Sequence, residues 1–112
     1  MSWHKLPELQ FAPNNIALTE VDGRKICIGR FEDKLYAFEH ECPHAGAPMH
    51  HGHIDGQCNV VCPQHGYAFN MKSGDNVTGE GFHLLHWPVE KRKDGWYVGF
   101  EVKKSFWSFL RK

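Results

Sequence analysis

The stretch "ECPHAGAPMHHGHIDGQCNVVCPQHG", from Glu41 to Gly66, contains two short units that each pair one cysteine with one histidine. The first unit is Cys42-Pro43-His44 and the second is Cys62-Pro63-Gln64-His65. Seventeen residues separate the two units. Two thiolates and two imidazoles can bind a tetrahedral zinc ion or coordinate an iron–sulfur cluster.

The order of the ligands favours the cluster. Zinc fingers usually place cysteine with cysteine and then histidine with histidine, whereas each unit here carries one of each. Two such arms that face each other can give one metal two thiolates and a second metal two imidazoles. That division is the one found in a [2Fe–2S] cluster with two chemically distinct irons. A zinc-binding module remains the alternative.

The two units, read as "CPHAGAP" and "CPQHGYAF", resemble the cluster-binding motifs C-x-H and C-x-x-H of the Rieske family. The resemblance extends over most of the chain. It implies an all-β fold, a Rieske-like antiparallel β-sandwich that forms a single domain over residues 1–112, with an inserted cluster-binding subdomain at about residues 40–70. It also implies one [2Fe–2S] cluster per chain, with Cys42 and Cys62 on the inner iron and with His44 and His65 on the outer iron.

The residues around the motifs indicate which branch of the family this chain resembles. The high-potential proteins of respiratory chains have cysteines that bridge the two arms at the positions of Ala47 and Gln64, and a sulfur-directed serine and tyrosine at the positions of Tyr67 and Phe69. Hydroxyl donors to cluster sulfur raise the reduction potential. Because this chain lacks them, it is more similar to the ferredoxin-type branch, which includes the ferredoxins of ring-hydroxylating dioxygenases and the small subunits of nitrite reductases.

Strand patterns dominate the rest of the chain. Asp22-Gly23 is a strong hairpin signal, and Ile26 and Ile28 occupy alternate positions, which predicts a half-buried strand. Turn residues then separate several more short runs of strand-forming side chains. The expected strands are Ile16–Val21, Arg24–Arg30, Leu35–Glu39, Tyr67–Asn70, Leu84–Lys91 and Gly95–Val102.

Composition excludes several classes of protein. The chain has 112 residues and a formal net charge of zero, so nothing indicates a nucleic-acid partner. No run of apolar residues approaches the roughly 18 needed to span a membrane. The start of the chain does not have the pattern of a secretory signal, and we therefore expect a cytoplasmic protein.

Other residues could mislead. His50, His51 and His53 suggest a second metal site, but we expect them to lie on the surface, because adjacent histidines in a strand point to opposite faces. Cys27 and Cys58 are expected to be free thiols in or near the core. The tail at 103–112 has one apolar helical face, which fits a short helix on the domain's own sheet, a docking segment for a partner, or a membrane-surface anchor.

The resemblance implies a one-electron carrier that passes electrons from a reductase to an oxygenase or reductase. Two alternatives remain: a stable small subunit of an enzyme like nitrite reductase, and a structural or regulatory metal-binding module. The sequence has no Gly-rich nucleotide-binding motif. We therefore expect an electron-transfer component rather than a catalyst on its own, with redox proteins as partners.

Overall fold

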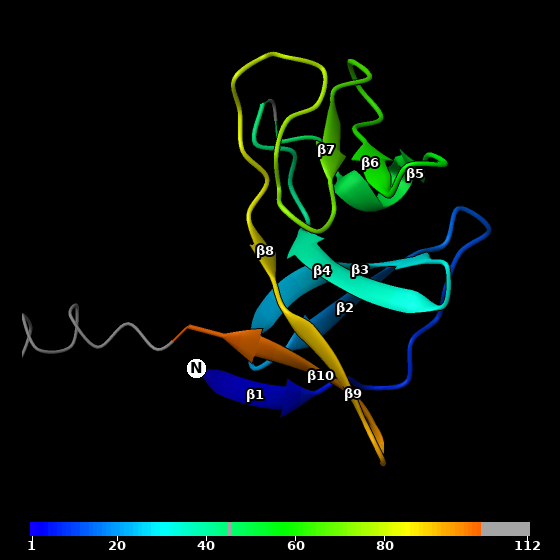
Figure 1. Cartoon of the computed structure of the whole chain (residues 1–112), viewed down its shortest axis with the longest axis vertical. Helices are drawn as coiled ribbons and strands as arrows, with labels where there is room; N and C mark the ends of the chain where they lie inside the picture. Colours follow the sequence, from blue (N-terminus) through cyan, green and yellow to red (C-terminus); the bar gives the residue numbers. More distant parts are fainter. Residues whose placement is uncertain (45, 102–112) are drawn as a thin grey trace, which may run out of the picture.

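The computed structural model describes residues 1–44 and 46–101, and within them the chain is almost entirely β (Figure 1). Every pair of neighbouring strands is antiparallel, which confirms the predicted fold class. The elements are β1 (Ser2–Lys5), β2 (Ile16–Val21), β3 (Arg24–Phe31), β4 (Lys34–Glu39), the 3-10 turn η1 (Met49–His51), β5 (His53–Ile54), β6 (Asn59–Val61), β7 (Ala68–Asn70), β8 (His86–Trp87), β9 (Val89–Arg92) and β10 (Gly95–Phe100).

The central sheet has the order β2-β3-β4-β8, and two tight hairpins build most of it. In the first hairpin, Asp22 and Gly23 have φ of 52° and 75°, the two positive values that a type I′ turn requires. In the second, Glu32 and Asp33 have φ of 50° and 64° although neither is a glycine. Both turns therefore connect their strands with only two residues.

The central sheet is buried on both faces. On β3, Ile26 and Ile28 point into a core shared with the outer sheet, while Cys27 between them belongs to a second core on the opposite face. The prediction of a half-buried strand is therefore wrong. The second face is covered because residues 40–85 fold over it, which local alternation in the sequence does not reveal.

The outer sheet has the order β1-β10-β9 and closes the sandwich on one side. β1 pairs with β10 in the register Ser2↔Phe100 to Lys5↔Tyr97, a contact between the two ends of the described chain. The sequence analysis did not predict β1. Between the outer and central sheets, Trp87 packs edge-on against Phe100, with ring centroids 5.4 Å apart.

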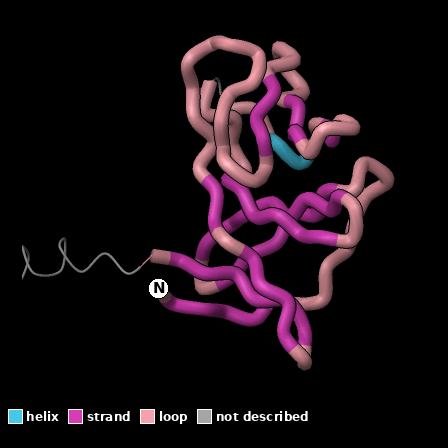
Figure 2. The backbone as a smooth tube through the Cα atoms, viewed as in Figure 1, coloured by secondary structure: helices cyan, strands magenta, loops and turns pink. Residues whose placement is uncertain are grey.

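The third sheet, β5-β6-β7, is small, and long loops surround it at one end of the molecule (Figure 2). Its attachment to the central sheet depends on Gly29 of β3. A Cβ atom at this position would lie 2.6 Å from Sδ of Met71 and 3.3 Å from Cδ1 of Ile54. A glycine here therefore lets the two parts of the protein pack closely.

Two expected elements differ in detail. The strand predicted over Leu84–Lys91 is divided into β8 and β9 at Pro88, which has no N–H to donate to a ladder. The histidines of the 49–53 segment are not all in a strand, since His50 and His51 lie in η1 with ring centroids 4.2 Å apart. The argument that they point to opposite faces is therefore wrong.

The remaining expectations concern segments at the end of the chain. The predicted tail helix at 103–112 and the last residue of the strand predicted at 95–102 lie outside the described residues. Within the described part, no helix has the length and apolar character needed to cross a lipid bilayer.

Candidate metal centre

Two loops form the candidate site, and their backbones follow the same pattern. The first loop follows β4 and begins at Cys42, whose N–H donates to the carbonyl of Ala47 at 2.8 Å. The second loop connects β6 to β7 and begins at Cys62, whose N–H donates to the carbonyl of Tyr67 at 2.7 Å. Each cysteine thus closes its loop through a bond to the residue five positions later.

A glycine completes each loop in the same way. The N–H of Gly46 donates to the carbonyl of Cys42 at 2.8 Å, and the N–H of Gly66 donates to the carbonyl of Cys62 at 3.2 Å. The two glycines have φ of 71° and 72°, in the region that only glycine adopts at no steric cost. The two arms therefore share the same two closing hydrogen bonds and the same glycine conformation, although the histidine is two residues after the cysteine in one arm and three in the other.

The structure brings the two motif histidines together at the tip of the arms. Nδ1 of His44 and Nδ1 of His65 are 3.4 Å apart, and the ring centroids are 4.9 Å apart. His65 is exposed and His44 is half-buried. Two nitrogens that each lie about 2.1 Å from one tetrahedral metal ion are about 3.4 Å apart, so this spacing fits shared ligation of one metal.

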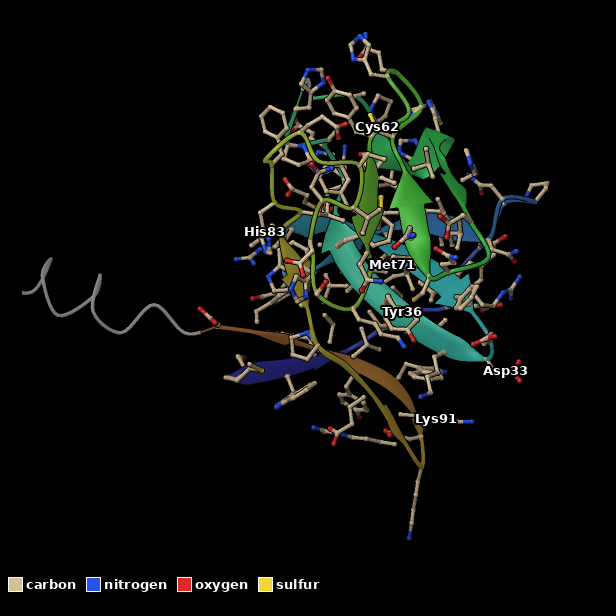
Figure 3. The ribbon with its side chains drawn as sticks, turned by 45° about the horizontal axis from the view of Figure 1, so that its top comes forward. Asp33, Tyr36, Cys62, Met71, His83 and Lys91 are labelled. Carbon is tan, nitrogen blue, oxygen red and sulfur yellow. The ribbon has the colours of Figure 1, made fainter. Side chains whose placement is uncertain are left out.

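The two motif cysteines lie beneath the histidines in the interior. Cys42 and Cys62 have exposed fractions of 2% and 1%, and both belong to the core between the arms and the central sheet. Figure 3 shows Cys62 near one end of the molecule, with Met71 between it and Tyr36. All four cysteines are within the described residues, and none forms a disulfide.

The arrangement of thiols inside and imidazoles outside fits a [2Fe–2S] cluster with distinct irons, which needs two protein ligands on each metal. In the described ranges 1–44 and 46–101, no three side chains among His, Cys, Asp and Glu form a group suited to one metal ion.

Aromatic side chains cover His44, which the sequence analysis missed. The ring of Tyr67 lies 4.4 Å from the His44 ring and the ring of Phe82 lies 5.2 Å from it, measured between centroids. Tyr67 follows the second arm directly, but Phe82 comes from a third loop, between β7 and β8. Phe82 lies in a segment without a strand pattern, so only the tertiary contact assigns it to the site.

A hydrogen-bond network shapes this third loop. The amide group of Asn76 donates to the carbonyl of Ala68 at 3.1 Å and to Oε1 of Glu80 at 2.9 Å, while its carbonyl oxygen accepts from the N–H groups of Glu80 and Gly81. The hydroxyl of Thr78 also donates to Glu80. These bonds lower the pKa of the Glu80 carboxyl, with a smaller contribution from His44. The negative charge of Glu80 is thus held beside the arms.

The remaining histidines of the region do not join the site. His51 and His53 are exposed, and His50 is half-buried. Burial lowers the pKa of His50, and its backbone carbonyl accepts a hydrogen bond from the Asn14 side chain at 2.9 Å. Asn14 also donates to the carbonyl of Gly52 at 2.8 Å, so it links the segment before β2 to the end of the first arm.

The two cysteines outside the motifs are buried, as predicted. Cys27 is fully buried on β3, and burial raises the pKa of its thiol to about 12. Cys58 is 4% exposed, and burial also raises its pKa, although a hydrogen bond with Tyr36 opposes the shift. Both thiols are therefore held in their neutral form.

Comparison with known proteins places these features in a family. The family model for the Rieske [2Fe-2S] domain matches residues 3–85. The methanesulfonate monooxygenase ferredoxin subunit of Methylosulfonomonas methylovora is 24% identical over 110 residues, which are 97% of this chain and 89% of that protein. Human apoptosis-inducing factor 3 is 34% identical over 80 residues, 70% of this chain, but the chain spans only 13% of that protein.

Solved structures show the same fold. The ferredoxin of carbazole 1,9a-dioxygenase from Nocardioides aromaticivorans IC177 superposes with a TM-score of 0.77 and 21% identity, covering 90% of this chain and 100% of that chain. A putative NADH-dependent nitrite reductase small subunit from Mycobacterium tuberculosis has a TM-score of 0.76 and 19% identity, with coverages of 90% and 96%.

Proposed function

Because this chain belongs to the Rieske [2Fe–2S] domain family, whose model matches most of its length, we propose that it is a one-electron carrier with one [2Fe–2S] cluster. Such a cluster, when bound, accepts and releases one electron at a time. The observation that carries the proposal is the 3.4 Å separation of the two Nδ1 atoms of His44 and His65 above two buried cysteines.

Each residue of the site has a distinct task in this proposal. Cys42 and Cys62 would hold the inner iron through sulfur, where the surrounding core would exclude water from the thiolates. His44 and His65 would hold the outer iron through Nδ1, at the tip of the arms. The cluster-binding subdomain at about residues 40–70 belongs to the single domain, and the loop that carries Phe82 extends its cover beyond those bounds.

The proposed partners are proteins rather than small substrates. We infer a reductase as donor and an oxygenase or another reductase as acceptor, with the exchange taking place in the cytoplasm. Support comes from relatives described as ferredoxins of monooxygenase and dioxygenase systems. It also comes from a structure described as a complex of reduced oxygenase and oxidized ferredoxin in carbazole 1,9a-dioxygenase, 29% identical over 80% of this chain.

A second candidate is a stable small subunit of an enzyme like nitrite reductase. The fold favours it as much as it favours the carrier, because the two TM-scores of 0.77 and 0.76 are nearly equal. A stable subunit would remain bound to one large enzyme through purification. A carrier would purify alone and would bind its partners only transiently.

Metal analysis of the purified chain, combined with voltammetry, tests the proposal. We expect a red-brown protein with about two irons and two sulfides per chain and a reversible one-electron wave, since one cluster stores one electron. A colourless chain that contains one zinc ion would refute the proposal and support the structural metal-binding module. The variants Cys27→Ala and Cys58→Ala should keep the full iron content, whereas Cys42→Ser and Cys62→Ser should lose it.

A further inference from the structure

A cavity of about 630 Å³ lies beside the start of β4, between that strand, the β8–β9 segment and the residues that follow β7. We call it the β4 cavity. Figure 3 labels four of its lining residues, Asp33, Tyr36, Met71 and Lys91. Pockets that hold small molecules have volumes of roughly 300–1,000 Å³, so the size of the β4 cavity fits such a ligand. None of the four motif residues lines it, so the cavity is separate from the proposed cluster ligands.

The walls of the β4 cavity are mainly aromatic and apolar. The residues that form them are Leu35, Tyr36, Met71, Trp87, Pro88, Val89 and Trp96. The hydroxyl of Tyr36 is already bonded to Cys58, so it does not leave an unsatisfied polar group in these walls. Indole rings pack well against other flat rings, and the thioether of methionine also contacts aromatic rings favourably. The walls therefore favour a ligand with a planar aromatic body.

Lysines dominate the charged groups of the β4 cavity. Its lining contains three lysines, Lys34, Lys72 and Lys91, against one carboxylate, that of Asp33. Within the part of the chain that the structure describes, no ion pair joins any of these lysines to a carboxylate. With Asp33 charged and His86 counted as neutral, three positive charges against one negative charge leave an excess of two. The cavity therefore favours an anion.

Two of the lysines lie close to the aromatic walls. Nζ of Lys91 is 5.7 Å from the ring centroid of Trp96, which is within the range of a cation–π contact and leaves the ammonium charged. Burial raises the pKa of the Cys58 thiol, and the hydrogen bond with Tyr36 and the positive charge of Lys72 oppose that rise. Lys72 is therefore near the Tyr36 side of the cavity. An anionic group attached to an aromatic ring would meet these charges beside the walls that hold the ring.

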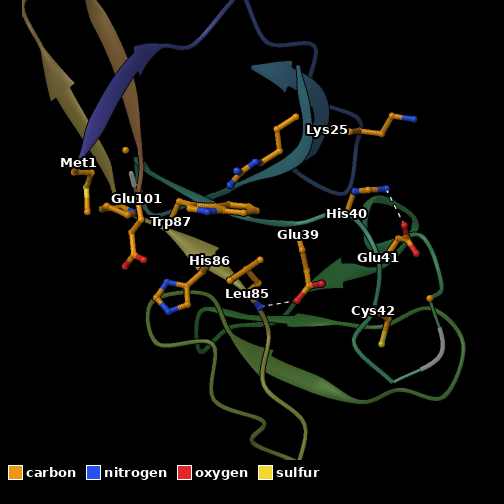
Figure 4. Close-up of a pocket in the computed structure, with 14 residues that line it drawn as sticks. Met1, Lys25, Glu39, His40, Glu41, Cys42, Leu85, His86, Trp87 and Glu101 are labelled. Atoms are coloured by element: carbon orange, nitrogen blue, oxygen red, sulfur yellow. Dashed lines mark hydrogen bonds and ion pairs between the residues drawn. The ribbon is translucent and has the colours of Figure 1, made fainter. Parts of the chain in front are cut away.

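A second cavity, of about 760 Å³, shares Trp87 with the β4 cavity but has no excess of positive charge (Figure 4). Its charged residues are Arg24, Lys25, Glu39, Glu41 and Glu101. Figure 4 shows two of these carboxylates in contacts: Glu41 lies 3.3 Å from Nε2 of His40, and Glu39 accepts from the N–H of Leu85 at 2.6 Å. Lys25 of this second cavity therefore provides a matched control for the lysines of the β4 cavity.

We propose that the β4 cavity binds a small planar aromatic anion. The aromatic body of the ligand packs against the indole of Trp96 and the thioether of Met71, and its anionic group lies among Lys34, Lys72 and Lys91. This site goes beyond electron transfer and does not depend on it, because no residue of the cavity is a proposed ligand of the cluster. Failure of the test below would therefore leave the proposed function unchanged.

Isothermal titration calorimetry of the full chain with its cluster tests the proposal with three probes. The probe 2-naphthoate has both the planar ring system and the charge, 2-naphthylmethanol has the same rings without the charge, and hexanoate has the charge without the rings. We expect 2-naphthoate to bind once per chain and each of the other two probes to bind at least about tenfold more weakly. Equal affinity for the naphthoate and either control, or no saturable binding at about 1 mM naphthoate, would overturn the proposal.

Single replacements of lysine locate the anionic group of the probe. Lys34→Gln and Lys72→Gln should each weaken the binding of 2-naphthoate by about two- to fivefold, because interactions between exposed charges are modest. Lys25→Gln, in the second cavity, should leave the affinity unchanged. All three side chains are exposed, so these variants keep the fold. An equal loss of affinity in Lys25→Gln, or no loss in either of the other two variants, would contradict the assigned cavity.

Nuclear magnetic resonance of the chain labelled with ¹⁵N-tryptophan locates the aromatic body of the probe. The indole N–H signal of Trp96 should shift during the titration with 2-naphthoate, because a bound ring changes the local magnetic field. Trp3 is the control, since it is exposed on β1 and does not line the β4 cavity. Its signal should remain in place. A titration that shifts the signal of Trp3 and leaves that of Trp96 unchanged would place the ligand elsewhere, and the proposal would be wrong.

Discussion

Glu39 is a half-buried carboxylate at the end of β4, beside the third loop. Burial raises the pKa of Glu39, and the nearby Glu41 carboxylate raises it further, while the N–H of Leu85 opposes the shift. The folded protein therefore binds this proton more tightly than the unfolded chain does. This tighter proton binding stabilises the folded protein at low pH. The stabilisation is lost as the pH rises through the folded-state pKa of Glu39.

The variant Glu39→Gln tests this sign. Its amide oxygen can still accept from the N–H of Leu85, but the side chain carries no charge to desolvate. We expect the melting temperature to rise by up to a few degrees at pH 8, with a smaller gain at pH 5, in thermal unfolding followed by circular dichroism. The control Glu20→Gln, on an exposed part of β2, should change little at either pH. A gain that is larger at pH 5 would contradict the assigned pKa shift.

Replacement of Phe69 tests the reduction potential of the cluster rather than the stability of the fold. Phe69 is fully buried in the core that contains Cys42 and Cys62, at the position where the high-potential branch has a hydroxyl. The variant Phe69→Tyr should raise the potential, because a donor to sulfur stabilises the reduced state. One hydrogen bond of about 1 kcal/mol corresponds to about 40 mV for one electron.

Voltammetry of Phe69→Tyr should be compared with Tyr36→Phe. The Tyr36 hydroxyl bonds to Cys58, which is outside the motifs, so its loss should leave the potential nearly unchanged. An unchanged potential in Phe69→Tyr, with full iron content, would mean that the new hydroxyl does not reach a cluster sulfur. A larger change in Tyr36→Phe would implicate Cys58 instead.

Among the elements, the β3–β4 hairpin has a correctable weakness. Glu32 and Asp33 occupy a two-residue turn with φ of 50° and 64°, a backbone conformation that Gly, Asn and Asp tolerate best and that is costly for Glu32. Replacement of the pair by Asn-Gly should raise the free energy of unfolding by about 1 kcal/mol. Chemical denaturation measures this change. Asp22→Asn is the control, because Gly23 already follows it, and a destabilised Asn-Gly variant would contradict the turn assignment.

These hairpins also show what the sequence could and could not predict. The Asp22-Gly23 turn and the alternation of Ile26 and Ile28 are local signals, and with the runs of strand-forming residues they predicted β2, β3 and β4 almost to the residue. β1 could not be predicted, because it pairs with a strand more than ninety residues away in the chain. The burial of β3 on both faces likewise depends on a second layer that local periodicity does not describe.

The candidate site was likewise predictable from the sequence only in part. The motif spacing predicted which loops approach each other, and the structure places His44 and His65 side by side. The cover from Phe82 was missed, because it depends on a loop whose shape comes from the Asn76 and Glu80 network rather than from any strand or helix pattern. Contacts of this kind follow from the folded loop and have no short sequence signature.

For the molecule as a whole, the central sheet acts as a platform. One of its faces completes a sandwich with the outer sheet, and the other supports the arms through the core that contains Met71 and Phe69. The arms contain little regular structure of their own, as Figure 2 shows, so their two matching loops depend on this support and on bound metal. A rigid support keeps the ligand positions fixed, which a one-electron carrier needs.

The central claim is that two histidines bind one iron of a two-iron cluster, and pulsed electron paramagnetic resonance of the reduced protein tests it most directly. In protein labelled with ¹⁵N-histidine, the account predicts couplings from two imidazole nitrogens, and from one in a His65→Cys variant that retains its cluster. A chain without a paramagnetic signal after reduction, or a spectrum without histidine nitrogen couplings, would contradict the account.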